Sequence, residues 1–98
     1  MIIVAGWLRV SADDRDRYLA TVANVAGLAR RAPGCLDFVQ AADPLDAERI
    51  NIFERWESDD ALERFRTSGA PEDPDAPEPP DLRTAEVQKY RIASVEAP

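Results

Sequence analysis

The hydrophobic pattern of the chain switches repeatedly between the period of a strand and the period of a helix. Residues 2–10 are rich in β-branched and aromatic side chains, contain no proline and predict a first strand whose two faces are both largely apolar. Residues 14–31 then have a helical period, with arginines at the end, and Pro33-Gly34 predicts where the helix stops. The apolar stripe of this helix consists of Tyr18, Val22, Val25 and Ala29.

The remainder of the pattern predicts a hairpin, a short helix and a last strand. Residues 35–41 and 49–57 read as two strands, and the turn-forming sequence at residues 43–46 joins them as an antiparallel pair. Residues 61–68 follow an acidic capping segment and predict a second helix. Alternation of apolar and polar residues resumes at residues 85–95, which predict a fourth strand.

The resulting element order is β-α-β-β-α-β. Unknotted, right-handed connections turn this order into an α+β, ferredoxin-like fold, a four-stranded antiparallel sheet with two helices on one face. The first strand would then leave Ile3 and Trp7 on the face that no helix covers. An uncovered apolar face favours a homodimer formed through the open sheet face. The length of 98 residues leaves no room for a second core, so we expect residues 1–98 to form a single domain.

Residues 70–84 interrupt the pattern with five of the eight prolines and five acidic residues against one arginine. Such a composition forms neither a helix nor a central strand. Two interpretations stay open for this acidic, proline-rich loop: it is a solvated connection, or it is a lid over a pocket.

Charge and composition exclude several classes of function. The net charge of -7 disfavours binding to nucleic acid or to an anionic membrane surface, since both require a basic face. The chain contains no histidine, which excludes the HExxH zinc site, the Ser-His-Asp triad and a histidine-ligated haem. The single cysteine, Cys35, cannot form an internal disulfide, and we expect it to be a small buried apolar residue in a cytoplasmic protein.

One segment of the chain carries a recognisable pattern. It reads Phe53-Glu54-Arg55-Trp56-Glu57-Ser58, followed by Asp60-Ala61-Leu62 and Phe65. This segment resembles the E-x-W-x-S, x-x-A-L signature of the antibiotic biosynthesis monooxygenase (ABM) superfamily, and the length and element order agree over residues 2–95. The resemblance implies a single ABM-like domain that forms a dimer, with an apolar pocket between sheet and helices.

The resemblance also implies a chemistry that needs no cofactor or metal. Known members include oxygenases of polyketide aromatics, quinol oxygenases and haem-degrading enzymes. An electron-rich phenol, once deprotonated, can pass an electron to molecular oxygen itself, so the protein needs only to bind it, remove the proton and stabilise the anion. We therefore predict a cofactor-independent monooxygenase acting on a hydroxylated aromatic or a quinol. The alternative is a non-catalytic dimeric ferredoxin-like domain that binds a small apolar ligand.

Two departures from the family pattern bear on this prediction. Haem-degrading members use a histidine of the second helix as the iron ligand, and Phe65 stands at that place here. The polyketide oxygenases pair an asparagine with the motif tryptophan, four residues before it, where this chain has Ile52. Asn51 is one residue off and would point to the opposite face of a regular strand.

Two residues of the third strand are the candidates for catalysis. The Trp56 indole would stack on a substrate ring and donate its N–H to a substrate oxygen, unless the residue is an ordinary core tryptophan. Glu54 shares its strand face and, if buried there, would have a raised pKa suited to a general base; the alternative is a salt bridge to an arginine. The candidates for substrate binding are Tyr18, Asn51, Ile52, Phe65 and Tyr90.

Overall fold

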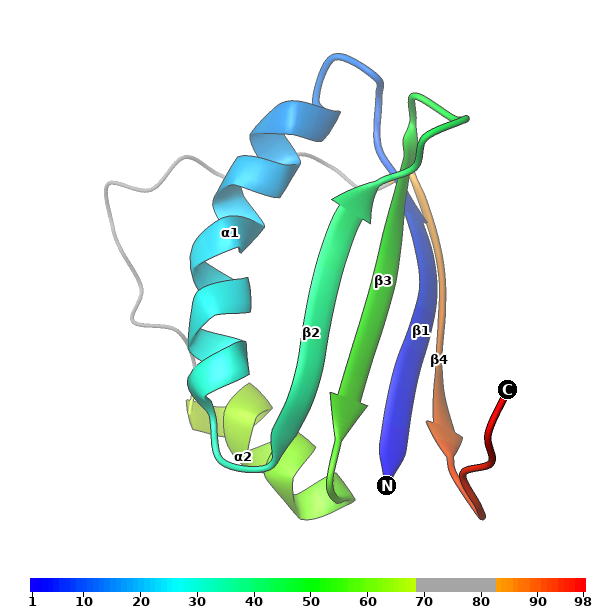
Figure 1. Ribbon diagram of the computed structural model, residues 1–98. Coiled ribbons are helices and arrows are strands. Elements are labelled where there is room, and N and C mark those ends of the chain that lie inside the picture. Colours follow the sequence, from blue (N-terminus) through cyan, green and yellow to red (C-terminus); the bar gives the residue numbers. More distant parts are fainter. Residues whose placement is uncertain (69–82) are drawn as a thin grey trace.

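The computed structural model describes residues 1–68 and 83–98 and confirms the expected order of elements (Figure 1). Four strands and two helices alternate as β-α-β-β-α-β. Their bounds are β1 (Ile2–Arg9), α1 (Arg15–Arg31), β2 (Cys35–Ala42), β3 (Arg49–Trp56), α2 (Asp59–Ser68) and β4 (Thr84–Arg91).

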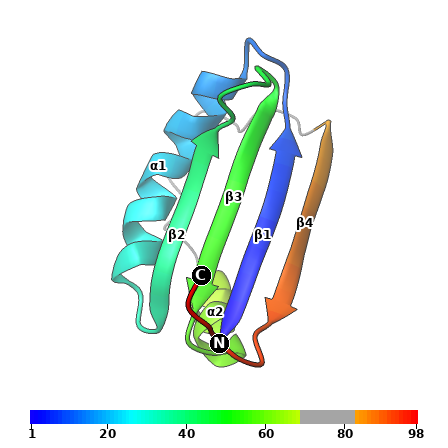
Figure 2. The ribbon, with the colours of Figure 1, turned by 45° about the vertical axis from the view of Figure 1, so that its right-hand side comes forward.

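The strands form one antiparallel sheet in the order β2-β3-β1-β4. β1, the strand predicted to be apolar on both faces, lies in the interior of the sheet, and Ile2 stands opposite both Trp56 of β3 and Arg91 of β4. Both helices lie on the same face, and Figure 2 shows them behind the sheet, whose open face is turned toward the reader. The predicted ferredoxin-like α+β architecture is therefore confirmed.

Two clusters of buried side chains join the helices to the sheet. α1 packs mainly on β2, and α2 covers one end of β3. The first cluster ties both helices to the sheet through Ile2, Val4, Ala29, Phe38, Trp56, Ala61 and Leu62. The second cluster lies at the other end of the helix face and consists of Leu8, Val10, Ile50 and Ile52, with Tyr18 and Leu19 of α1 packed against it. The helices thus cover the β2–β3 half of the sheet better than the β1–β4 half.

The edge strand β4 is exposed along its whole length. Its register with β1 places Lys89 opposite Val4 and Arg91 opposite Ile2, so both cations project toward the helix face. There Lys89 Nζ donates a hydrogen bond to Asp59 of α2 at 2.9 Å, and Arg91 forms an ion pair with the same carboxylate. On the helix side, polar contacts rather than apolar packing therefore connect β4 to α2.

The prediction that the fourth strand extends to residue 95 is wrong. β4 ends at Arg91 because its partner β1 begins at Ile2, and the antiparallel ladder has no strand left to continue on. Ile92 still donates its backbone N–H to Met1 O at 3.0 Å. Beyond it the chain leaves the edge and passes to the open-face side of the sheet (Figures 1 and 2).

Two glycines are required by the backbone. Gly6 in β1 has a φ of +153°, and a Cβ atom there would lie 1.9 Å from the carbonyl oxygen of Glu86 in β4. Gly34 has a φ of +83° and follows the end of α1, where a Cβ would meet the side chain of Ala61 at 2.5 Å. The stop signal read from Pro33-Gly34 therefore reflects the close approach of α2 as well as the left-handed conformation.

Most of the predicted loop over residues 70–84 lies outside the described residues. The two interpretations of this loop, a solvated connection or a lid, therefore also concern residues outside the described part of the chain. Its predicted end is one residue late, because Thr84 already belongs to β4. Neither helix of the described chain combines the length and the hydropathy that a membrane-crossing segment requires.

Candidate functional site

The E-x-W segment of β3 faces the helices. Residues 50, 52, 54 and 56 alternate inward along the strand, as predicted, and the sheet register places Glu54 between Val4 of β1 and Phe38 of β2. Both of these neighbours are buried. The strand alternation therefore brings a carboxylate onto a face that is otherwise apolar.

Trp56 is fully buried in the first cluster. Its ring lies 5.3 Å from the ring of Phe65 in α2, and Phe65 in turn contacts Phe38 edge-on at 6.3 Å between centroids. The indole Nε1–H donates a hydrogen bond to Glu54 Oε1 at 3.0 Å. The only donor of the indole is thus used inside the protein, and the predicted bond from this N–H to a substrate oxygen is not free to form in this structure.

Glu54 is half-buried, and opposing influences act on its pKa. Burial raises the pKa, while the hydrogen bond from Trp56 and the guanidinium of Arg66 lower it without cancelling the effect of burial. No ion pair within residues 1–68 and 83–98 includes Glu54, so the salt-bridge interpretation finds no partner there. A carboxylate in this setting holds its proton more readily than an exposed one and suits the role of a general base.

Cys35 lies next to this pair on β2, opposite Trp56. Burial raises the pKa of its thiol, and the negative charges of Glu54 and Asp37 raise it further. The thiol therefore stays protonated at neutral pH. Cys35 is only partly buried, whereas the sequence pattern predicted a buried residue.

A cavity of about 170 Å³ lies where the end of α1 meets α2. Phe65 connects it to the Trp56–Glu54 pair, because it lines the cavity and contacts Trp56. Trp56 and Glu54 themselves do not line it. Among the described residues, the lining consists of Ala32, Pro33, Ala61, Arg64, Phe65 and Ser68. This lining could not be predicted from the sequence, since it forms where the end of one helix meets a second helix far along the chain.

Tyr18 and Ile52 lie on the same face of the sheet as Glu54, but at the end occupied by the second cluster. Ile52 belongs to that cluster, and Tyr18 packs against it. The Tyr18 hydroxyl donates a long hydrogen bond of 3.4 Å to Gln40 Oε1, and burial raises its pKa, so it remains a neutral phenol. Ile52 is 8% exposed and contributes packing.

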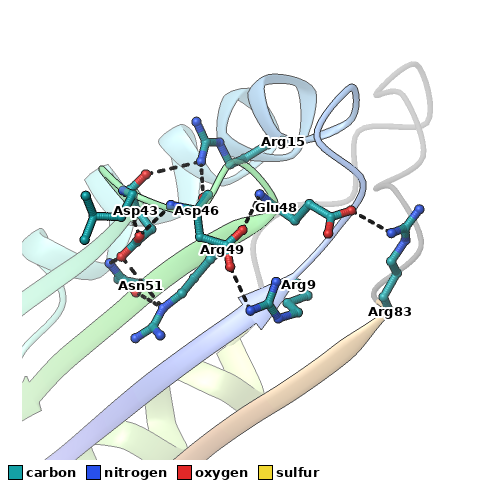
Figure 3. A network of polar contacts seen from close by, with 9 residues as sticks. Arg9, Arg15, Asp43, Asp46, Glu48, Arg49, Asn51 and Arg83 are labelled. Carbon is teal, nitrogen blue, oxygen red and sulfur yellow. Dashed lines mark hydrogen bonds and ion pairs between the residues drawn. The ribbon is translucent and has the colours of Figure 1, made fainter.

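The structure separates Asn51 from Trp56 and Glu54. Asn51 pairs with Trp7 on the open face, donates to Asp43 Oδ1 at 2.8 Å and accepts a hydrogen bond from Arg49 Nε at 2.7 Å (Figure 3). The β1–β3 register is regular, and the irregularity of the sheet lies in β2 between Cys35 and Asp37. No bulge in β3 turns Asn51 inward, and the residue stabilises the hairpin.

Tyr90 also lies on the open face, opposite Ile3 in the β1–β4 register. It is 46% exposed, and its hydroxyl donates to Gln88 Oε1 at 3.1 Å. Five of the seven candidates therefore lie on the helix face, and the sheet stands between them and the other two, Asn51 and Tyr90.

The sequence profile described as antibiotic biosynthesis monooxygenase matches residues 1–73. The chain belongs to this family. No curated protein sequence matches the chain.

Solved structures of family members have the same fold over nearly the whole chain. A candidate antibiotic biosynthesis monooxygenase from Deinococcus radiodurans is 17% identical, with a TM-score of 0.77 over 99% of this chain and 97% of its own. Another candidate from Chloroflexus aurantiacus is 26% identical, with a TM-score of 0.70 over 98% and 96%. The heme-degrader MhuD of Mycobacterium tuberculosis, solved with two hemes in its active site, is 18% identical, with a TM-score of 0.67 over 99% and 100%.

The residues of this chain do not fit an imidazole-ligated haem. The chain has no histidine, and Phe65, at the place of the expected iron ligand, packs between Phe38 and Trp56. In the part of the chain that the structure describes, no three histidine, cysteine or acidic side chains come together as a metal site.

Proposed function

We propose that this ABM-family protein is a cofactor-independent monooxygenase of a hydroxylated aromatic or a quinol, and that Glu54 is its general base. The observation that carries the proposal is a half-buried carboxylate on an apolar sheet face, hydrogen-bonded to a buried indole and paired with no cation in the described chain. Family membership favours monooxygenase chemistry.

The reaction would begin with proton transfer. The O–H bond of the substrate breaks and the proton moves to the Glu54 carboxylate, which leaves an electron-rich oxyanion. This anion passes an electron to molecular oxygen, and the two radicals combine at a ring carbon. For a ring CH₂ group, whose enol tautomer supplies the O–H, the peroxide takes the proton back from Glu54 and then loses water. One oxygen atom becomes the carbonyl oxygen, and the other leaves as water with the returned proton and the remaining hydrogen of that carbon. No external reductant is required.

The cavity beside Phe65 supplies the place from which a substrate would approach. Its walls are mostly apolar, while Arg64 and Ser68 add polar groups. An aromatic substrate would stack against Phe65, and the Arg64 guanidinium would stabilise the anion. Phe65 would have to move aside for a substrate to meet Glu54, because that ring lines the cavity and packs on Trp56, the hydrogen-bond partner of Glu54.

We also propose that the working form is a homodimer through the open sheet face, in a reducing cytosol that suits the single cysteine. Phe53 and Tyr90 are 38% and 46% exposed on this face. The guanidinium groups of Arg9 and Arg49 each lie 5.4 Å from the centroid of the Trp7 ring. Such a mixture of aromatic rings and arginines is typical of protein interfaces.

Oxygen uptake with a panel of dihydroxynaphthalenes, anthrones and menaquinols tests the enzyme proposal. We expect uptake by the wild type on one class and a loss of about 10²- to 10⁴-fold in Glu54→Gln, the range typical of a removed general base. Glu57→Gln is the matched control, because Glu57 belongs to the same segment but is exposed, and it should keep full activity. Wild-type protein that consumes no oxygen on any of these compounds overturns the proposal.

One observation favours the alternative, a non-catalytic domain that binds a small apolar ligand. Trp56 is packed on all sides, and the cavity does not contact Glu54. Under this alternative, the same compounds would bind, with chemical-shift changes confined to residues around Phe65, and none would be oxidised.

A further inference from the structure

We infer that Trp56 acts through Glu54: its indole N–H fixes Oε1 of the carboxylate, and the other oxygen, Oε2, receives the substrate proton. Trp56 is then a positioning residue rather than a substrate contact. The role of Oε2 in catalysis rests on the proposed function, whereas the effect of the Trp56 N–H on the Glu54 carboxylate does not.

The backbone sets the two groups side by side. Residues two apart on a strand project from the same face, so Glu54 and Trp56 are nearest neighbours along β3. The 3.0 Å distance from Nε1 to Oε1 is that of a well-formed hydrogen bond. A bond from a neutral donor to a carboxylate is stronger than one between two neutral groups.

The donor in this pair cannot turn to another acceptor. Trp56 is 0% exposed and lies against Phe65 within the first cluster. An indole has one donor and no acceptor, and burial holds its ring in one orientation. Glu54, which is half-buried, is therefore the flexible partner, and Trp56 limits the positions that its carboxylate can occupy.

The two carboxylate oxygens of Glu54 therefore differ in their hydrogen bonding. Oε1 accepts the Trp56 N–H, and no donor in residues 1–68 or 83–98 bonds to Oε2. A carboxylate anchored at one oxygen presents the other in a defined direction, which general-base catalysis requires.

Charged and titratable groups of α1, α2, β2 and β4 surround the Glu54–Trp56 pair. From α2, Arg66 favours the ionised form of Glu54. From β2, Cys35 faces it as a protonated thiol. The cations Arg30 of α1 and Lys89 of β4 have other partners: Arg30 donates to Phe38 O at 2.9 Å, and Lys89 pairs with Asp59. The Trp56 N–H is thus the direct contact that favours the carboxylate against its burial.

Titration of Glu54 by ¹³C NMR in wild type and Trp56→Phe tests the inference without any substrate. Phenylalanine keeps an aromatic ring and removes the N–H. We expect the pKa of Glu54 to rise by about one to two units, the shift that corresponds to losing a hydrogen bond to a charged group. Phe65→Leu, which removes a neighbouring ring but no donor, should leave this pKa near its wild-type value. An unchanged pKa in Trp56→Phe overturns the inference.

The wild type provides a second measurement that does not depend on how well the variant folds. The chain has two tryptophans, so two indole N–H signals are expected, and Trp7 on the open face is an internal control. The Trp56 Hε1 shift should follow the titration of Glu54, whereas the Trp7 signal should not. A Trp56 signal that is indifferent to the ionisation of Glu54 overturns the inference.

Kinetics then separate this inference from the proposed function. If the wild type oxidises a substrate, Trp56→Phe should lower kcat, shift the acid limb of its pH profile upward and leave KM within about twofold. A raised KM with an unchanged kcat would show that Trp56 contacts the substrate and would overturn the inference. If the wild type oxidises nothing, the proposed function fails, and the two NMR measurements still decide whether the pair is coupled.

Discussion

At the scale of single residues, the chain places an acid where packing alone would favour an apolar side chain. Strand alternation is enough to predict that Glu54 shares a face with Trp56 and Ile52, and the structure confirms it. The hydrogen bond between Glu54 and Trp56 could not be predicted, because it depends on side-chain rotamers and on the burial of the indole by α2. Such a placement costs stability and is therefore typical of functional sites.

The pH dependence of Glu54→Gln measures this cost. Burial raises the pKa of Glu54 in the folded state, so folded protein binds the proton more tightly than unfolded protein. The contribution of Glu54 to stability therefore falls as pH rises from the unfolded pKa through the folded pKa. Glutamine has no such titration and still offers an oxygen to the Trp56 N–H.

We accordingly expect the free energy of unfolding of Glu54→Gln, relative to wild type, to increase between pH 4 and pH 8. Urea denaturation across this range is the measurement, with Glu57→Gln as the exposed control. A difference between wild type and Glu54→Gln that stays constant with pH would contradict the assignment of Glu54 as a destabilised acid.

At the scale of elements, two glycines with opposite surroundings offer a matched pair of substitutions. A Cβ on Gly6 would collide with the backbone of β4, whereas a Cβ on Gly27, exposed in α1, would meet nothing within 4 Å. Gly6→Ala should destabilise the protein by about 3 kcal/mol or more, because neither backbone can give way without breaking the β1–β4 ladder. Gly27→Ala should stabilise it by about 0.5–1 kcal/mol through helix propensity. Thermal unfolding of both variants tests whether Gly6→Ala lowers the melting temperature and Gly27→Ala raises it.

On the helix side, β4 is connected to α2 through Asp59 rather than through apolar packing. The hydrogen bond from Lys89, together with Arg91, holds the pKa of Asp59 below its ordinary value. The stability that Asp59 contributes is therefore present above its unfolded pKa and lost as pH falls through its folded pKa. Asp59→Asn should increase hydrogen exchange of the β4 amides most strongly at neutral pH and low salt, since these side chains are partly exposed and screened by ions.

Exchange mass spectrometry of the β4 peptide, with Asp60→Asn as the control on the same helix turn, tests this prediction. Asp60 is exposed and makes no ion pair within the described residues, so its variant should exchange like the wild type. Equal protection of β4 in Asp59→Asn at every salt concentration would show that the β1 ladder alone holds the strand.

At the scale of the whole molecule, the topology was predictable and the site was not. Periodicity, the capping segments and Pro33-Gly34 predict six elements in the right order, because each is a local signal with one simple physical cause. The cavity lining joins Pro33 to Ser68, residues far apart in the chain that only the packed helices bring together. Asn51 lies on the opposite face of the sheet from Trp56, as strand alternation predicts for a family pattern shifted by one residue.

The arrangement of the sheet predicts that two copies of the chain meet through its open face. Phe53 lies at its centre, opposite Ala5 of β1 and Val39 of β2, and it takes no part in either buried cluster. Phe53→Glu should therefore leave the fold intact and place a charge in the middle of an apolar interface, where an unpaired carboxylate is costly. Sedimentation measures the mass of the assembly. We expect the wild type at twice the chain mass and Phe53→Glu at the chain mass. Leu45→Glu is the control, because Leu45 is 96% exposed at the tip of the hairpin, and it should sediment like the wild type. Wild type that sediments as a monomer, or a Phe53→Glu variant that remains dimeric, would show that this face is not where two copies meet.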